Sequence, residues 1–294
     1  MRAVPPTGHG DPVRPLIRVD IPAVEAIQHP DLLWQIHDGT VDIAVLRGFI
    51  DPQVMAAANN ALAGDVSDFP RTASEAVDTN QNHVHVLGMA VAPSQIEGDV
   101  PYLEQYLAAA GPFRAACARV FPAGDGFMER IQQLFDRVGG GRPVRVYRDP
   151  ASGRPYTPVT IRIVPPGCGM PLHSGLDFLG LEAYDHLRTD LDCSEQLSFF
   201  SPIALPEAGG ELVVYHLNVH DPSRPLNEQG ALDNDVVLET VSSEVVRLSP
   251  GDLVVFAGGR WYHRVSAVQG DRIRRTIGGF LGFTPDHRRI FYWS

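Results

Sequence analysis

The chain has 294 residues, 44% of them hydrophobic, and a formal net charge of −11. It is long enough for one large core, and its acidic balance argues against binding to a nucleic-acid polymer or an anionic membrane. No apolar run is long enough to predict a membrane-spanning helix, and the N-terminus lacks the apolar stretch of a signal peptide. The three scattered cysteines fit neither a disulfide framework nor a thiolate zinc site, so we expect a cytoplasmic protein.

The N-terminal half has mainly helical patterns. Helices are predicted at 51–63, 101–120 and 128–138. Asp51-Pro52 is typical of a helix start, because aspartate caps the first turn and proline fits within it. Gly111-Pro112 is expected to divide the second segment into two short helices. Three consecutive glycines, 139–141, are expected to end the third.

From Pro143 onward, short runs rich in Val, Ile, Phe and Tyr are separated by turn residues. Strands are predicted at 143–148, 157–164, 195–203, 211–217, 236–241, 244–248, 252–257, 262–268 and 272–283. Such a series indicates a sandwich or barrel. We expect a flexible tail over 1–15 and one mainly β domain over 16–294. Its core is expected to be a double-stranded β-helix (jelly roll, cupin-like) over about 142–294, with the helices of about 16–141 packed outside.

Two histidines far apart in the sequence are candidate metal ligands. His173 follows a turn-rich segment, and His263 follows an apolar strand and a Gly-Gly turn. Histidines on neighbouring strands of a small barrel can meet in space, and two neutral imidazoles with one carboxylate form a common site for ferrous iron. The carboxylate normally stands two residues after the first histidine, where this chain has Gly175. A missing carboxylate would leave a coordination position that a halide could fill.

Asp177 is the alternative third ligand. It stands four residues after His173 rather than two. Along an extended strand, two residues span about 7 Å and four span about 13 Å. Two ligands of one iron must lie within roughly 3 Å of each other, so Asp177 would need a turn at Ser174-Gly175 to reach the metal.

An arginine pair downstream of His263 suits a dicarboxylate co-substrate. The far carboxylate of 2-oxoglutarate needs a buried, bidentate cation. Because side chains alternate along a strand, only one of Arg274 and Arg275 can point inward. We favour Arg275, with Arg274 as the alternative.

Several longer segments share a family resemblance. They are 156–162 (YTPVTIR), 173–178 (HSGLDF), 206–215 (PEAGGELVVY), 258–266 (GGRWYHRVS), 274–281 (RRTIGGFL) and 292–294 (YWS). In these segments the chain closely resembles the freestanding iron- and 2-oxoglutarate-dependent halogenases of the WelO type. The similarity covers Tyr156 to Ser294 and extends more weakly through the helical half.

The resemblance implies a site and a reaction. Fe(II) would be bound by His173 and His263, with chloride beside Gly175 and 2-oxoglutarate at the remaining positions. The enzyme would use O2 to decarboxylate 2-oxoglutarate and to place chlorine on an unactivated carbon. Ser198 matches a family position close to the reacting oxygen. Thr160 and Arg162 match a strand that lines the co-substrate pocket, although both residue types are also common on the solvent face of a strand.

The substrate is expected to be a small molecule. Arginines at 71, 142, 145, 148 and 154 favour an anionic substrate such as a deoxyadenosine nucleotide, unless they are solvated surface residues. Aromatic residues at 178, 200, 215, 261 and 262 would stack equally well on a purine or on the indole of an alkaloid, so an alkaloid or other natural product is the alternative. Segment 68–95 is a candidate lid. A hydroxylase on the same scaffold and a noncatalytic binding module are the competing functions.

Overall fold

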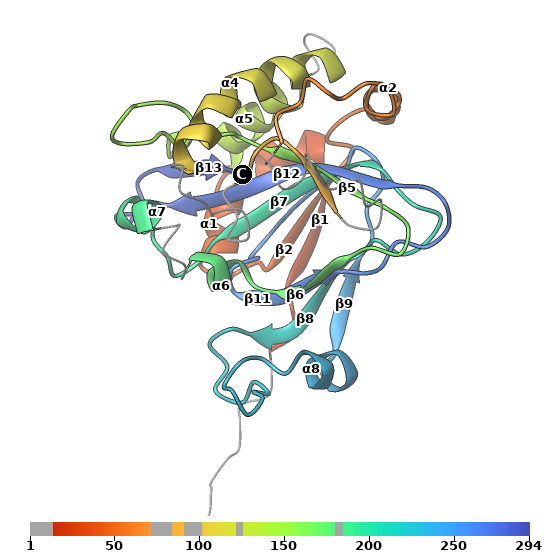
Figure 1. The fold of residues 1–294 in the computed structure, drawn as a ribbon. Coiled ribbons are helices and arrows are strands. Elements are labelled where there is room, and N and C mark those ends of the chain that lie inside the picture. The colour runs from red at the N-terminus through yellow and green to blue at the C-terminus, as the bar shows by residue number, and fades with distance from the viewer. Residues whose placement is uncertain (1–13, 72–83, 91–101, 122–125, 180–184) are drawn as a thin grey trace, which may run out of the picture.

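The computed structural model describes residues 14–71, 84–90, 102–121, 126–179 and 185–294. Two β-sheets face each other, and helices cover the outer face of the larger one (Figure 1). Two packed layers of secondary structure are the usual way in which a domain encloses one hydrophobic core.

The larger sheet has nine strands and draws on the whole length of the chain. Its members are β1 (Arg18–Pro22), β2 (Ile43–Arg47), β3 (His85–Leu87), β4 (Val144–Val146), β5 (Thr160–Val164), β7 (Leu197–Ala204), β10 (Leu253–Phe256), β12 (Arg274–Phe283) and β13 (Ile290–Trp293). The strands pair in the order β1-β2-β10-β7-β12-β13-β4. β5 pairs with the first half of β12 and with β3.

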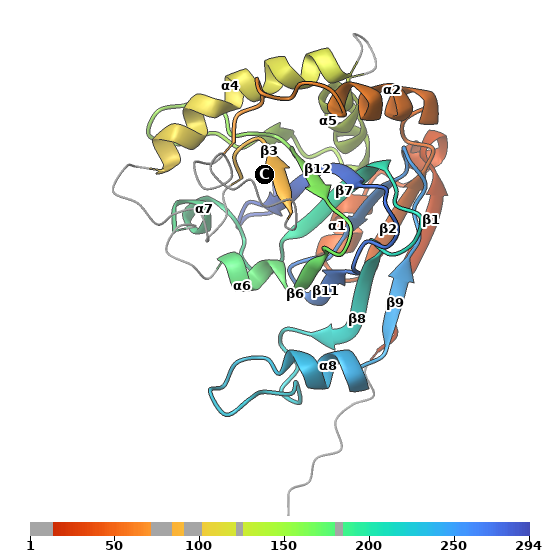
Figure 2. The same ribbon diagram turned by 45° about the vertical axis from the view of Figure 1, so that its right-hand side comes forward.

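The smaller sheet has four strands in the order β6-β11-β8-β9. They are β6 (Met170–His173), β8 (Leu212–Asn218), β9 (Ser243–Val246) and β11 (Trp261–Val265). Two short helices, α6 (Gly175–Leu179) and α8 (Asn234–Thr240), flank this sheet and its loops, whereas α7 (Asp185–Asp190) packs beside β13 of the larger sheet. The turned view places the smaller sheet and α8 on the side away from the long helices (Figure 2).

The long helices cover the outer face of the larger sheet. They are α2 (Pro52–Leu62), α4 (Tyr102–Val120) and α5 (Phe127–Val138), preceded in the chain by η1 (Ala23–Gln28) and α1 (Leu32–His37). Phe135 of α5 packs edge-on against Phe199 of β7, with ring centroids 5.0 Å apart. Phe199 therefore faces the helices, and its neighbours Ser198 and Phe200 face the smaller sheet, because side chains alternate along a strand.

Most of the predicted elements form, but the structure also has strands β6 and β13 outside the predicted ranges, and it differs from the predictions in three further ways. Pro112 lies inside α4 and does not divide it, because a continuous buried face of that helix outweighs the cost of proline. The strand expected at 236–241 is wrong, since this segment is α8, whose N-cap Asp233 accepts a hydrogen bond from Val236 N at 3.1 Å. β1, β2 and β3 come from the part of the chain that was expected to be helical.

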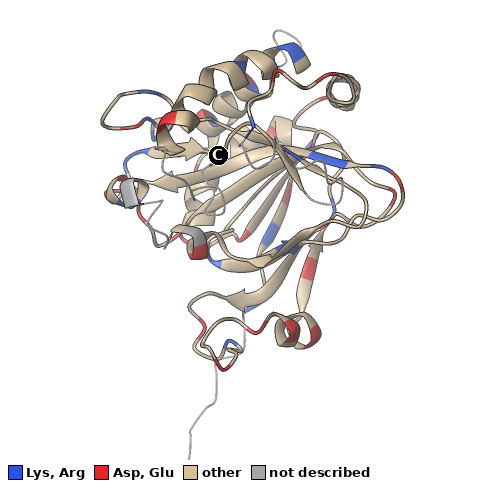
Figure 3. Ribbon diagram, in the orientation of Figure 1, with Lys and Arg blue, Asp and Glu red and all other residues tan. Residues whose placement is uncertain are grey.

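Charged side chains are distributed over the surface rather than gathered on one face. Asp235 and Glu239 lie on α8, where Figure 3 shows acidic residues at the end of the molecule beyond the smaller sheet. Within the described residues, no helix has the length and apolar character needed to cross a membrane.

Candidate metal centre

His173 and His263 meet directly across two paired strands of the smaller sheet. The two residues are Cα partners in the β6–β11 ladder, and their ring centroids lie 4.3 Å apart. Phe256 packs edge-on against His263 at 4.9 Å between centroids. His263 is buried, whereas His173 is partly exposed. The structure thus brings together the two histidines that the sequence singled out.

Both imidazoles are prepared to bind a metal through the same atom. His173 Nδ1 lies 2.8 Å from Pro171 O, and His263 Nδ1 lies 2.9 Å from Trp261 O. In the neutral ring Nδ1 then donates to the carbonyl, and Nε2 keeps its lone pair for a metal. Burial lowers the pKa of both histidines, and the positive charge of Arg162 lowers them further. Neutral imidazole is the form that binds iron.

No carboxylate of the described residues completes this pair. Among these residues, one group of three or more His, Cys, Asp or Glu side chains has ligand atoms close enough to share a metal, and it contains neither His173 nor His263. Gly175 stands where a carboxylate would be expected. Two imidazoles without a third protein ligand are the arrangement that leaves room for an anion from solution.

The Asp177 carboxylate takes part in a local capping interaction instead of completing the metal site. Its Oδ2 accepts a hydrogen bond from Ser174 N at 3.1 Å, and its own N donates to Ser174 Oγ at 3.2 Å. This reciprocal pair is a capping box at the start of α6. The turn that Asp177 would have needed does form at Ser174-Gly175, but it uses the carboxylate to begin a helix.

Glycines allow three segments to approach closely around Gly175. Gly175 N donates to Gly258 O at 2.8 Å, and Gly259 N donates to Gln196 O at 2.7 Å. A Cβ at Gly258 would overlap Ser198 Oγ, and a Cβ at Gly259 would lie 2.6 Å from Gln196 N. At Gly259 the neighbouring backbone is too close for a side chain, and at Gly258 the space is filled by the side chain of Ser198. Ser198 is thereby held beside the turn that leads to His263.

On β12 the expected direction of the two arginines needs correction. Arg275 Nη1 donates to Asn59 Oδ1 of α2 at 2.7 Å, so Arg275 points to the outer, helix-covered face. The guanidinium of Arg274 lies over the Phe200 ring at 5.4 Å, on the inner face. Alternation limited the choice to one arginine, but the position of the second sheet decides which one points inward.

Arg274 has the properties of an anion-binding residue. Its side chain is 4% exposed, and its Nε has no hydrogen-bond partner. Burial and, to a smaller extent, the charge of Arg162 lower its pKa to about 10, although Glu211 opposes this shift. A buried guanidinium is expected to be paired with an anion, because an unpaired buried charge is costly. The site therefore fits the distal carboxylate of 2-oxoglutarate.

The two β5 residues named from the sequence have different surroundings. Arg162 is the ladder partner of Thr276, which shares a face of β12 with Arg274. Its positive charge also lowers the pKa of both metal-site histidines. Thr160 forms a 2.7 Å hydroxyl–hydroxyl hydrogen bond with Ser294 and fixes β5 to the C-terminus.

The arginines expected to attract an anionic substrate are mostly engaged elsewhere. Arg145 pairs with Asp136 at 3.1 Å, and Arg154 pairs with Glu104 at 2.6 Å. Arg142 donates to His287 O at 2.8 Å, and Arg148 donates to Gly153 O at 2.8 Å. These arginines stabilise loops and helix contacts, so they give no support for a phosphate site.

The aromatic residues expected to stack on a substrate are partly structural. Trp261 Nε1 donates to the buried Asp42 at 2.8 Å, and Tyr215 OH accepts from Arg264 Nε at 2.9 Å. Tyr262 belongs to a hydrophobic cluster on the smaller sheet. The side chain of Phe178 lies outside the described residues, as do positions 72–83 and 91–95 of the candidate lid.

A second histidine group was not found from the sequence. His37, Asp192 and His287 have ligand atoms within 4.8 Å of one another, a spacing that could hold a metal ion. His287 Nε2 lies 2.7 Å from Asp192 Oδ2, and His37 Nε2 lies 3.5 Å from the same oxygen. The three residues come from α1, from the loop after α7 and from the loop before β13. No sequence spacing could have connected them.

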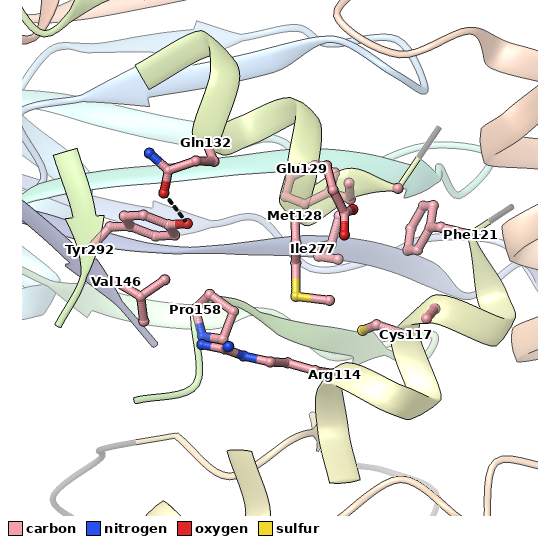
Figure 4. Close-up of a pocket in the computed structure, with 13 residues that line it drawn as sticks. Arg114, Cys117, Phe121, Met128, Glu129, Gln132, Val146, Pro158, Ile277 and Tyr292 are labelled. Atoms are coloured by element: carbon pink, nitrogen blue, oxygen red, sulfur yellow. Dashed lines mark hydrogen bonds between the residues drawn. The ribbon is translucent and has the colours of Figure 1, made fainter. Parts of the chain in front are cut away.

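Two cavities lie in different parts of the fold. The smaller, about 220 Å³, reaches Arg274 and Phe200 on the inner face of the larger sheet. The larger, about 560 Å³, lies between α4, α5 and the outer face of that sheet, and Figure 4 shows Arg114 and Cys117 pointing into it. None of the metal-site residues lines the larger cavity. The smaller cavity is lined by neither histidine, but it contains Arg274, the candidate residue for the co-substrate carboxylate.

The chain was compared with known proteins. A family model described as "Carrier-protein-independent halogenase WelO5" matches residues 16–294. A solved N-substituted L-amino acid dioxygenase from Burkholderia ambifaria AMMD superposes with a TM-score of 0.56 at 16% identity, covering 88% of this chain and 90% of that one. A 2OG-Fe(II) oxygenase family oxidoreductase from Burkholderia pseudomallei has a TM-score of 0.46 at 13% identity, covering 94% and 99%. No curated protein matches the chain.

Proposed function

The chain belongs to the WelO5 family of carrier-protein-independent halogenases, and from this premise we propose that it chlorinates an unactivated sp3 carbon of a free small molecule. Such enzymes are non-haem iron oxidoreductases that depend on 2-oxoglutarate and chloride. The observation that carries the proposal is the directly paired His173 and His263 with no third protein ligand among the described residues. We infer that the two facing sheets are the double-stranded β-helix expected for this class.

Each site residue has a proposed task. His173 and His263 hold iron through Nε2, and the space at Gly175 admits the halide. Arg274 binds the distal carboxylate of 2-oxoglutarate, replacing Arg275 in that assignment. Arg162 adds positive charge on the same face. Iron, once bound, supplies the activation of O2 that the protein side chains cannot perform.

Further residues position these groups. Ser198, fixed beside Gly258, is placed to donate a hydrogen bond close to the reacting oxygen. Thr160 holds β5, and with it Arg162, against the C-terminus.

The substrate is the least constrained part of the proposal. We propose a deoxyadenosine nucleotide as the first candidate. This choice rests on the family resemblance alone, since the arginines that suggested a phosphate site have other partners. An indole alkaloid or another natural product is the alternative. No described residue near the metal pair singles out either class.

Two measurements test the proposal. Anaerobic addition of Fe(II) and 2-oxoglutarate should produce a visible charge-transfer band, and its absence would indicate a noncatalytic module. A screen of nucleotides and indole alkaloids with O2 and chloride, read by mass spectrometry, should find a chlorinated product. Exclusive incorporation of oxygen would assign the chain to the hydroxylases instead.

A further inference from the structure

The backbone of Gln196 is fixed immediately beside the turn that precedes His263. Gln196 is 3% exposed and stands just before β7. Its carbonyl accepts a hydrogen bond from Gly259 N at 2.7 Å, and its N donates to Glu195 Oε1 at 3.0 Å. Because both backbone groups have partners, the Gln196 backbone is held beside this turn.

That side chain reaches the space left by the missing carboxylate. A Cβ built at Gly175 would lie 2.8 Å from Gln196 Nε2. The amide nitrogen therefore stands where a side chain at position 175 would begin. Within the described residues the hydrogen bonds of Gln196 are made by its backbone, and its side-chain amide donates to no protein acceptor. Although the residue is only 3% exposed, the amide nitrogen is not fully buried, so it can donate to an acceptor that enters from solution.

We propose that the Gln196 amide N–H binds the halide that occupies the space at Gly175. The inference rests on the proposed function, since it assumes that an anion enters there. A halide accepts hydrogen bonds from any direction, so one fixed donor suffices to hold it. A neutral amide adds no negative charge of its own, so the positive charge of the iron would be balanced by the halide and by 2-oxoglutarate. A glutamate at the same position would repel the halide or take its place on the metal.

The experiment measures halide affinity rather than turnover. Chloride is titrated anaerobically into the enzyme loaded with Fe(II) and 2-oxoglutarate, and the shift of the charge-transfer band gives a Kd. In Gln196→Met, which keeps the length of the side chain but removes the donor, we expect a chloride Kd about 10- to 100-fold higher, the equivalent of one hydrogen bond to a charged group. The Kd for 2-oxoglutarate without chloride should stay close to that of the wild type.

Two further variants make the result decisive. Gln132→Met, the same substitution in the outer cavity, should leave the chloride Kd unchanged. Gln196→Glu has nearly the same shape as the wild type and should abolish the chloride response while still giving the band. If Gln196→Met does not fold, the chloride titration of Gln196→Glu is sufficient to test the proposal. A wild type that responds to chloride beside a Gln196 variant with the same Kd overturns this inference alone. A wild type without any response overturns the proposed function as well.

Discussion

Two regions of the molecule each bring two imidazoles together, and they differ in what surrounds them. His37 and His287 have the carboxylate of Asp192 beside them, whereas His173 and His263 have none among the described residues. By composition alone, the first group would be the better match to a two-histidine, one-carboxylate iron site. The family membership and the strand pairing nevertheless favour iron at the second.

The difference lies in how the donor atoms are already used. Asp192 Oδ2 accepts from His287 Nε2 at 2.7 Å, closer than the roughly 3 Å between two ligands of one metal ion. Trp34 packs against both imidazoles of this group, with centroids 5.2 and 5.0 Å away. At the other site each Nδ1 lies beside a backbone carbonyl, so Nε2 is the ring nitrogen with a lone pair in both neutral imidazoles. Residue composition suggests a site, but prior hydrogen bonding decides whether it can act.

Exchange of the histidines gives the largest expected effect. His173→Ala or His263→Ala should abolish the iron-dependent charge-transfer band and lower turnover by more than about 100-fold. Losing a residue that only hydrogen-bonds to a metal ligand already costs up to about 100-fold, so losing the ligand itself should cost more. His37→Phe and His287→Ala serve as matched controls and should retain the band. Loss of the band in the controls alone would move the iron to the other group.

Gly175→Asp should change the product more than the iron. The new carboxylate would take the halide position and would displace the Gln196 amide, which lies 2.8 Å from the Cβ. We expect chlorination to be lost and some hydroxylation to be retained, as read by mass spectrometry of the products. Gly175→Ala separates the volume of a side chain from its charge. Undiminished chlorination in Gly175→Asp would falsify the proposal that the halide occupies the space left at Gly175.

The two neighbouring arginines should give unequal effects on co-substrate binding. Arg274→Met removes a buried guanidinium, and we expect the Kd of 2-oxoglutarate to rise by about 100-fold, since charge-assisted bidentate pairs are worth several kcal/mol. Arg275→Met should change it by less than about threefold, because that side chain bonds to α2 on the other face. The reverse order, measured by anaerobic titration, would restore Arg275 to the site.

The smallest expected effect is a pH dependence of stability that arises from His37. Burial lowers its pKa to about 4, while an unfolded histidine titrates near 6.5. Between these values the unfolded chain binds a proton that the folded chain does not, so the free energy of unfolding falls as the pH falls. From pH 7 to pH 5 we expect a loss of roughly 1–2 kcal/mol from this residue. Urea unfolding of His37→Phe should show a shallower pH dependence than the wild type, and equal slopes would exclude His37 as the cause.

Local signals in the sequence were read correctly where they act locally. Asp51 caps α2 by accepting from Gln53 N at 2.7 Å, and α5 ends at Val138 before the three glycines. The same kind of reasoning failed at Pro112 and at 236–241. At Pro112, burial against the sheet outweighs a helix breaker. At 236–241, β-branched residues suggested a strand, but the Asp233 cap and packing of Val237 favour a helix.

The sequence by itself determined the candidates for the site: His173, His263, the glycine at 175 and one of two adjacent arginines. It could do so because residue type and strand alternation are properties of the chain alone. Only the tertiary structure decided that Arg274 points inward, that Asp177 caps a helix and that Gln196 reaches the space at Gly175. These outcomes depend on which surfaces face each other when the two sheets pack, and that relation lies beyond the reach of local sequence spacing.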